Sequence, residues 1–352
     1  MAMRKFLKIC AIILLVPVVI FAIVIGFATL TDYRPDVSEV FPNLKSTSDT
    51  LPDSAAINLL IWNIGYCGLD KHMDFFYDGG TKVRTPEEQL RFNYSAISRF
   101  LQTDDSVDMI LLQEVDVRSK RSYRINEVQQ FTEVLNEYSA YYGKNYDVFF
   151  VPVPPAHPMG AVNSGLLSLS RINPATTARY TFPGQYGWPK RLFMLDRCFM
   201  VMRFPVSNGK ELLVINTHNE AYDDGSIRDQ QMSYLKEFLL SEYKQGNYIV
   251  VGGDWNQCPP GFKPHFSEDV FDTLNNKGVE VNYLPPDWQW VYDANTPTNR
   301  RLDIAYSRGK TLTTVIDYFL LSPNVRPLAY KITDLGFENS DHQPVSIKIA
   351  LK

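Results

Sequence analysis

The sequence predicts an α/β domain behind one apolar N-terminal helix. Three observations support this fold class: short apolar runs typical of buried strands recur along the chain, apolar residues between some of them have helical spacing, and polar clusters follow several of the runs. In α/β sheets, ligands bind at the carboxyl ends of the strands, so we expect the functional residues there. The 352 residues are 45% hydrophobic and 21% charged, enough for a large core in one α/β domain or two smaller ones.

The N-terminal apolar stretch covers residues 9–30, which carry no charge and follow Arg4, Lys5 and Lys8. Its 22 residues are long enough to cross a bilayer. A cleaved signal peptide is the alternative, but its apolar core is usually shorter and no clear small-x-small cleavage site follows. We therefore expect a single-pass signal anchor, with the basic N-terminus in the cytoplasm and the rest of the chain on the extracytoplasmic side.

Three segments follow from this division of the chain. Residues 1–30 are expected to be the cytoplasmic stub and anchor, residues 31–55 an extended tether rich in Pro, Ser, Thr and Asp, and residues 56–352 the main folded domain. Beyond residue 30 the chain has 32 Lys and Arg against 39 Asp and Glu, a net charge of -7. The overall field of such a domain does not steer it towards polyanions, although a local basic patch could still serve.

The four cysteines are scattered and form no CxxC pair. They are Cys10, Cys67, Cys198 and Cys258, and the first lies in the apolar leader. The remaining odd number argues against a disulfide framework and against a zinc site.

In the first half of the domain, two strands end in polar residues. Residues 57–62 predict a strand that ends at Asn63, which could instead be a simple strand-end cap. Residues 85–88 (Thr-Pro-Glu-Glu) predict a capped helix start. Residues 107–112 predict a buried strand that runs into Glu114, either a solvated strand tip or a ligand.

The middle of the chain has weaker patterns. We expect strands at residues 146–153 and 166–169, a turn at residues 163–165, and a strand pair at 199–204 and 212–215.

Polar residues then follow the later strands. His218 follows the strand that ends near residue 215, and Arg228 lies on the next helix, where a structural role is favoured over contact with phosphate. A strand at residues 248–251 runs through two glycines into Asp254 and Asn256, for which an ordinary β-turn is the alternative.

The last third holds a long aperiodic stretch and two further polar sites. Residues 258–312 have little periodicity, and a stretch of this length is usually functional or covers something. Asp317 lies inside an apolar strand, and a buried carboxylate needs a partner. Asp341 and His342 form a loop before the final strand, where a polar turn is the alternative.

These residues together form a coherent chemical set. Carboxylates and amides suit a hard cation such as Mg²⁺ or Mn²⁺, and two histidines suit proton transfer near neutral pH. The set fits attack by water on a phosphorus centre.

The order and spacing of the motifs closely resemble the endonuclease/exonuclease/phosphatase superfamily, from about Ile57 to Lys352. The motifs are Trp62-Asn63, Leu112-Gln113-Glu114-Val115, Asn216-Thr217-His218, Gly253-Asp254-Trp255-Asn256, the strand 316–321 and Ser340-Asp341-His342-Gln343-Pro344-Val345. The resemblance implies a four-layer α/β sandwich of two sheets with helices outside.

The resemblance also implies roles for individual residues. Asn63, Glu114 and Asp341 are expected at the metal site. His342 is expected to be the general base and Asp317 its orienting carboxylate. Asp254 and Asn256 are expected to hold the scissile phosphate and the attacking group, and His218 to contact phosphate or assist the leaving group.

The sequence departs from the family pattern in three respects. Trp255 stands where the family usually has Phe, no carboxylate can be placed beside His218, and the loops after Asn63 and Asn256 match no branch. Because such loops choose the substrate, its identity stays open.

The favoured function is a membrane-anchored, Mg²⁺-dependent phosphodiesterase of nuclease type, expected to be a monomer. A phospholipid diesterase of the sphingomyelinase type is the alternative, with Phe75, Phe76, Tyr77, Trp288 and Trp290 either entering a membrane interface or packing loops onto the sandwich. An inositol-phosphate phosphatase lacks an evident basic loop. A non-catalytic binding module or a structural membrane protein would not need the complete polar set.

Overall fold

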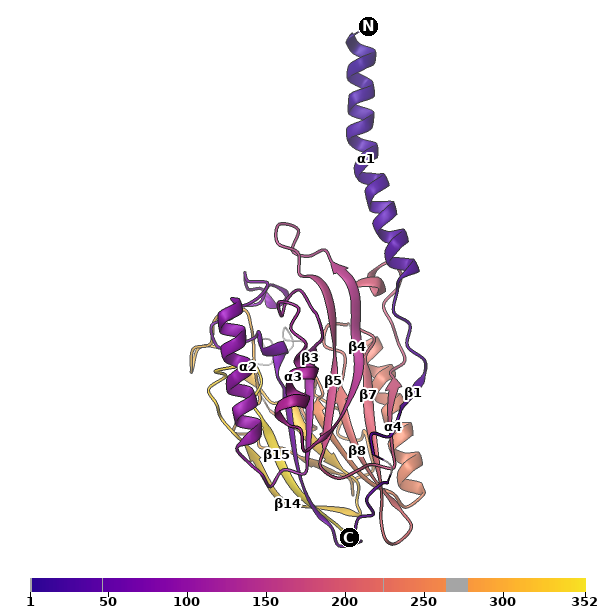
Figure 1. Ribbon diagram of the computed structural model, residues 1–352, viewed down its shortest axis with the longest axis vertical. Coiled ribbons are helices and arrows are strands. Elements are labelled where there is room, and N and C mark those ends of the chain that lie inside the picture. Colours follow the sequence, from indigo (N-terminus) through magenta and orange to yellow (C-terminus); the bar gives the residue numbers. More distant parts are fainter. Residues whose placement is uncertain (1, 46, 224, 264–277) are drawn as a thin grey trace.

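Two β-sheets packed face to face form the centre of the protein (Figure 1). The computed structural model describes residues 2–45, 47–223, 225–263 and 278–352. Part of the aperiodic stretch 258–312 therefore lies outside the described residues.

The first sheet has seven strands in the order β1-β6-β7-β8-β9-β13-β10. Its central pair, β8 and β9, is parallel, and β13 runs antiparallel to β9. The bounds are β1 Ser38–Phe41, β6 Thr176–Thr181, β7 Cys198–Pro205, β8 Glu211–His218, β9 Tyr248–Asp254, β10 Gln289–Val291 and β13 Asp317–Leu321.

The second sheet has six strands in the order β14-β15-β2-β3-β5-β4. Its parallel pair is β2 and β3, and the final strand β15 runs antiparallel to β2. The bounds are β2 Ala56–Asn63, β3 Met109–Asp116, β4 Ser139–Val151, β5 Gly160–Ser170, β14 Val325–Ile332 and β15 Val345–Leu351, and a small separate ladder pairs β11 Asn299–Arg300 with β12 Thr313–Thr314.

Helices cover the outer faces, which gives four layers. Helices α2 (Glu87–Gln102) and α3 (Glu127–Val134) pack on the six-stranded sheet, and α4 (Ser226–Lys244) packs on the seven-stranded sheet. Short 3-10 turns η1 (Gly65–Cys67), η2 (Phe76–Asp78) and η3 (Lys190–Phe193) lie in the loops. The fold confirms the four-layer α/β sandwich.

Strand β2 is almost continuously apolar because both of its faces are buried. Leu59 and Ile61 face the core between the sheets, whereas Leu60 and Trp62 face the helices on the other side. Strands buried on both faces have no polar face to present.

Helix α1 (Ala2–Leu30) extends away from the sandwich (Figure 1). By length and composition, residues 3–30 could cross a membrane, and most of this helix is exposed. The predicted tether 31–55 is not wholly free of the domain, because β1 pairs with β6 at the edge of the seven-stranded sheet.

Two local predictions differ from the structure. The turn expected at residues 163–165 is wrong. These residues belong to β5 and pair with β4, and the chain reverses direction between the two strands in the proline-rich segment 152–159. The capping box at Thr85 does not form, because the Thr85 hydroxyl donates to Asp70 Oδ2 (2.9 Å) and the helix begins after Pro86.

Candidate active site

A cavity of about 600 Å³ opens where the site-bearing strands of the two sheets end. Six of the predicted residues line it: Glu114, His218, Asp254, Asn256, Asp341 and His342. Asn63 and Asp317 are buried and hydrogen-bonded to that lining. The structure therefore brings the eight predicted site residues together around one cavity, which the sequence alone could only imply by analogy.

Close packing of the strands makes this convergence possible. A Cβ on Gly253 would lie 2.1 Å from the Thr217 carbonyl oxygen of β8, and a Cβ on Gly252 would lie 2.7 Å from Ile61 on β2 of the opposite sheet. Only glycine allows β8, β9 and the opposite sheet to approach this closely. As a result His218 and Asp254 are direct neighbours in the ladder.

Two site residues have left-handed backbone conformations. Glu114 has φ 55° at a bulge in β3, and Asn256 has φ 49° just after β9. Non-glycine residues adopt this region rarely and at a cost in free energy, and such residues cluster at functional sites. The bulge explains how Glu114 lines the cavity although Gln113 beside it is buried in the sheet.

His342 and Asp317 form a buried pair. His342 Nδ1 lies 2.8 Å from Asp317 Oδ2, and His342 Nε2 lies 2.9 Å from the side-chain nitrogen of Asn299. In the neutral ring that accepts a hydrogen bond from the Asn299 amide at Nε2, the ring proton is on Nδ1 and points to Asp317. This is the tautomer in which Nε2 can accept a proton.

Nearby carboxylates dominate the charge state of His342. Burial opposes its ionisation, but Asp317, Asp341 and Asp254 outweigh burial and raise the pKa of His342 well above its ordinary value. Its Nε2 lies 3.8 Å from both Asp254 Oδ2 and Asp341 Oδ2.

His218 has the opposite environment. Burial and the positive charge of Arg197 hold the pKa of His218 well below its ordinary value, so the ring is neutral at neutral pH. Its Nε2 lies 3.4 Å from Asp254 Oδ2. No described residue bonds to its buried Nδ1, in line with the missing carboxylate noted in the sequence.

Asn63 links two of the carboxylates. Its side-chain nitrogen donates to Asp254 Oδ2 (2.9 Å) and to Glu114 Oε1 (3.3 Å), while its oxygen accepts from the Gly65 backbone amide (3.0 Å). In this arrangement one lone pair of the Asn63 oxygen is already used, and the amide positions Glu114 and Asp254. The amide oxygen keeps a second lone pair, so the metal-site role that the resemblance implies for Asn63 stays a prediction.

The acidic side of the cavity suits a hard cation. Burial, together with the charge of Glu114, raises the pKa of Asp341 to about 7. Two carboxylates that repel each other at the end of a cavity are relieved by a divalent cation, and Mg²⁺ and Mn²⁺ prefer such oxygen ligands. Asp254, Asp317 and His342 also lie close enough to share an ion, but His342 Nδ1 is already bonded to Asp317.

Five cationic side chains outside the predicted site line the same cavity: Arg121, Lys190, Arg197, Arg300 and Arg301. Arg121 is bound to Asp116 and stacks on Tyr66 at 3.7 Å. Arg197 lies 3.5 Å from Glu220, and its Nη1 is buried without a hydrogen-bond partner among the described residues. Neither Arg121 nor Arg197 belongs to a recognisable motif, and neither ends a predicted strand.

Arg228 does not line this cavity. Its guanidinium donates to the backbone oxygens of Glu220 and Ala221 and lies 3.4 Å from Asp223. The structure therefore favours the structural role for Arg228, holding the loop between β8 and α4, over contact with phosphate.

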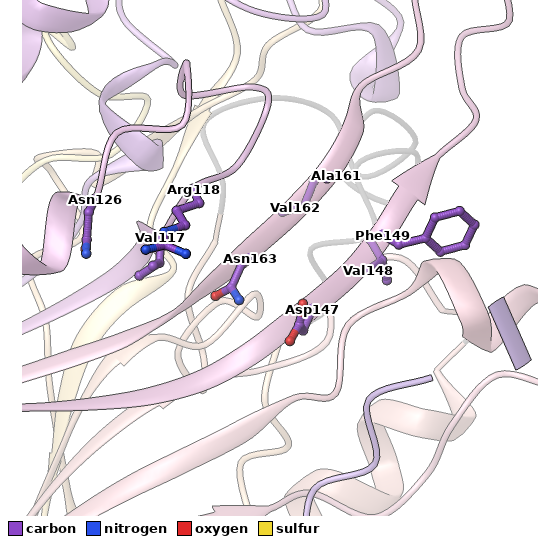
Figure 2. Close-up of a pocket in the computed structure, with 9 residues that line it drawn as sticks. All are labelled: Val117, Arg118, Asn126, Asp147, Val148, Phe149, Ala161, Val162 and Asn163. Carbon is purple, nitrogen blue, oxygen red and sulfur yellow. The ribbon is translucent and has the colours of Figure 1, made fainter. Parts of the chain in front are cut away.

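A smaller hollow of about 320 Å³ lies on β4, β5 and the loop after β3 (Figure 2). Its lining contains none of the predicted site residues. Figure 2 shows the Phe149 ring pointing away from the other labelled side chains.

A family model matches this arrangement over residues 60–342, and its description is the Endonuclease/Exonuclease/phosphatase family. The chain belongs to this family. Membership makes it a phosphoester hydrolase, as the motifs indicated. No curated protein matches the chain.

Solved structures show the endonuclease/exonuclease/phosphatase fold at low sequence identity. A family protein from Beutenbergia cavernae has TM-score 0.52 at 15% identity, covering 84% of this chain and 72% of that one. ANGEL2, a 2',3'-cyclic phosphatase in complex with adenosine-2',3'-vanadate, has TM-score 0.54 at 17% identity, covering 88% and 99%. TDP2 from D. rerio, complexed with single-strand DNA product, has TM-score 0.50 at 13% identity, covering 84% and 99%.

Proposed function

We propose that the protein is a divalent-metal-dependent phosphodiesterase in which water attacks phosphorus. The observation that carries this proposal is the position of the His342–Asp317 pair beside Glu114 and Asp341 in one cavity. A base beside an acidic cation site is the arrangement that hydrolysis of a phosphoester requires.

The metal would be held by Glu114 and Asp341, with Mg²⁺ or Mn²⁺ as the ion that fits their oxygens. When bound, it would supply positive charge to the phosphate oxygens and offset the carboxylates that raise the pKa of His342. Asn63 would keep Glu114 and Asp254 in place through the two hydrogen bonds described above.

His342 would take the proton of the attacking water at Nε2. Asp317 keeps the ring proton on Nδ1 and stabilises the imidazolium that forms. Asp254 Oδ2 lies near Nε2 of both histidines and would orient the water, while Asn256 lines the cavity beside it.

His218 would act as a neutral hydrogen-bond donor to a phosphate oxygen. Its depressed pKa disfavours a role as the acid that protonates the leaving group, which was one of two roles that the resemblance implied. Arg121 and Arg197 add positive charge on the same wall, where negative charge develops in the transition state.

The nuclease that the sequence favours and its alternative, a phospholipid diesterase, share this chemistry. Membrane attachment through residues 9–30 and an extracytoplasmic position are part of the same proposal, supported by the length and exposure of α1.

The test is turnover of bis(p-nitrophenyl) phosphate by the full-length protein in detergent, with Mg²⁺ or Mn²⁺ and then with EDTA. We expect activity that EDTA abolishes and that Glu114→Gln reduces at least about 100-fold, because Glu114→Gln removes one of two charged ligands. Glu88→Gln, on the exposed face of α2, is the matched control. Equal turnover with and without metal would contradict the proposal.

A further inference from the structure

The last turns of α1 pack against the catalytic domain. Ile25 and Ala28 are buried with Leu192, and the rings of Phe27 and Phe149 meet edge to face at 5.0 Å. Cleavage of the leader would expose the apolar side chains that these contacts bury. The contacts therefore support retention of α1. They also fix how the domain sits relative to this helix.

The β4–β5 hairpin beside this contact is uncharged and largely apolar, although Arg191 and Asp32 pair at the contact itself. From residue 148 to residue 170 the chain carries no Asp, Glu, Lys or Arg. The tip of the β4–β5 hairpin in this segment exposes Phe149 and Val153, and the neighbouring Trp188 is 60% exposed while its indole nitrogen bonds to Thr29 (3.2 Å). In Figure 1 this hairpin reaches beyond the point where α1 leaves the sandwich.

The catalytic cavity lies at the same end of the molecule. Strand β15 runs towards the C-terminus, which Figure 1 shows at the end opposite to α1. His342 precedes β15, and β2, antiparallel to it, ends at Asn63. Both residues are therefore at the end from which α1 leaves.

One short segment joins the cavity to α1. On η3, Leu192 packs on α1 and Arg191 lies 3.4 Å from Asp32 just after it. Lys190 at its start and Met194 after its end line the catalytic cavity. Residues 190–194 therefore contact both the catalytic cavity and the end of α1.

We propose that this face, formed by residues 149–158 and Trp188 beside the end of α1, is a bilayer-docking surface that presents the cavity to the membrane in which α1 is anchored. The substrate is then the phosphoester head group of a lipid in that membrane. The proposal rests on the proposed function for the chemistry and identifies its substrate class.

Charge and cavity size favour a lipid over a nucleic acid. An uncharged hairpin with an exposed Phe suits the membrane interface, where Trp and Phe side chains partition. Phosphate backbones are held by Lys and Arg, which residues 148–170 lack. The chain after residue 30 has a net charge of -7. Six of the eight proposed site residues are buried, all but Glu114 and Asn256, and the cavity has a volume of about 600 Å³, which suits a single head group better than a duplex.

The first test uses fluorescence and does not depend on activity. Full-length protein is placed in phosphatidylcholine nanodiscs with or without dibrominated acyl chains, and the wild type is compared with Trp188→Phe. We expect bromine to quench the wild type clearly more than Trp188→Phe, because Trp62, Trp255 and Trp288 are buried in the sandwich. Equal quenching of the two proteins would overturn the docking surface.

The second test measures cleavage of lipid, bis(p-nitrophenyl) phosphate and plasmid DNA by protein in nanodiscs of phosphatidylethanolamine, phosphatidylglycerol and sphingomyelin. The double variant Val153→Asp, Ala156→Asp charges the hairpin tip, and Leu328→Asp on the exposed side of β14 is the matched control. We expect the hairpin variant to lose at least about tenfold in lipid hydrolysis while turnover of bis(p-nitrophenyl) phosphate is unchanged. The control should retain both.

The outcomes separate the two proposals. Wild-type protein that cleaves the soluble diester and nicks plasmid DNA but no lipid would overturn the lipid substrate and establish the nuclease branch. Protein that cleaves none of the three would contradict the proposed function, and the quenching experiment would still decide the docking surface.

Discussion

The two sides of the catalytic cavity each present a buried histidine, yet they differ in charge. On the side of β13 and β15, His342 has a partner at each ring nitrogen and three carboxylates that raise its pKa. On the side of β8, His218 is near Arg197 and has a lowered pKa, with its Nδ1 unpaired in the described part of the chain. The proposed mechanism follows this difference: it gives proton transfer to His342 and neutral hydrogen bonding to His218.

The largest expected effect follows removal of the proton acceptor. His342→Ala should lower kcat/KM for a phosphodiester by about 10³ to 10⁴, the range associated with a positioned general base. The exposed His72→Ala should leave the rate unchanged. If His342→Ala retained activity within tenfold of the wild type, the base would have to be sought elsewhere.

A smaller effect is expected on the other side. His218→Phe removes the donor and keeps a ring, and we expect a loss of about 10 to 100-fold, comparable to loss of one hydrogen bond to charge. His218→Gln, which keeps a donor, should recover part of that loss. A loss as large as that of His342→Ala would break the distinction between the two histidines.

The smallest effect concerns Asn299, which contacts His342 Nε2 at 2.9 Å. Asn299→Ala should lower kcat/KM by about fivefold, because one hydrogen bond that orients the ring is lost. Asn295→Ala, exposed in the same long stretch, serves as the control. An unchanged rate in Asn299→Ala would show that Asp317 alone orients the ring.

The site residues at the strand ends were predictable from the sequence because each comes after an apolar run. Asn63 and Asp254 end their strands and Glu114 lies near the end of β3, and strands buried on both faces are easy to recognise. The four-layer sandwich followed from the resemblance and is confirmed. The conformation of Glu114 was not predictable, because a bulge depends on the pairing between β3 and β5.

The residues that were missed lie where the sequence has little periodicity. Asn299 reaches His342 from the stretch 258–312 through an isolated bridge, a contact set by tertiary structure. Arg197 precedes β7 in an irregular segment. Trp288 and Trp290, considered as membrane contacts, pack instead with the core against the seven-stranded sheet, the packing alternative that the sequence left open.

The pH dependence of kcat/KM, measured for the wild type and His218→Gln at saturating Mg²⁺, tests the central distinction most directly. A base must be unprotonated to act, so the rate should rise with pH as His342 loses its proton. Because the pKa of His218 lies below its ordinary value of 6.5, that ring is already neutral in the pH range where the rate rises. His218→Gln should therefore lower the rate without shifting the pH at which the rate rises. A rise in rate that shifts to another pH or disappears in His218→Gln would contradict the proposed roles of the two histidines and make His218 the titrating group.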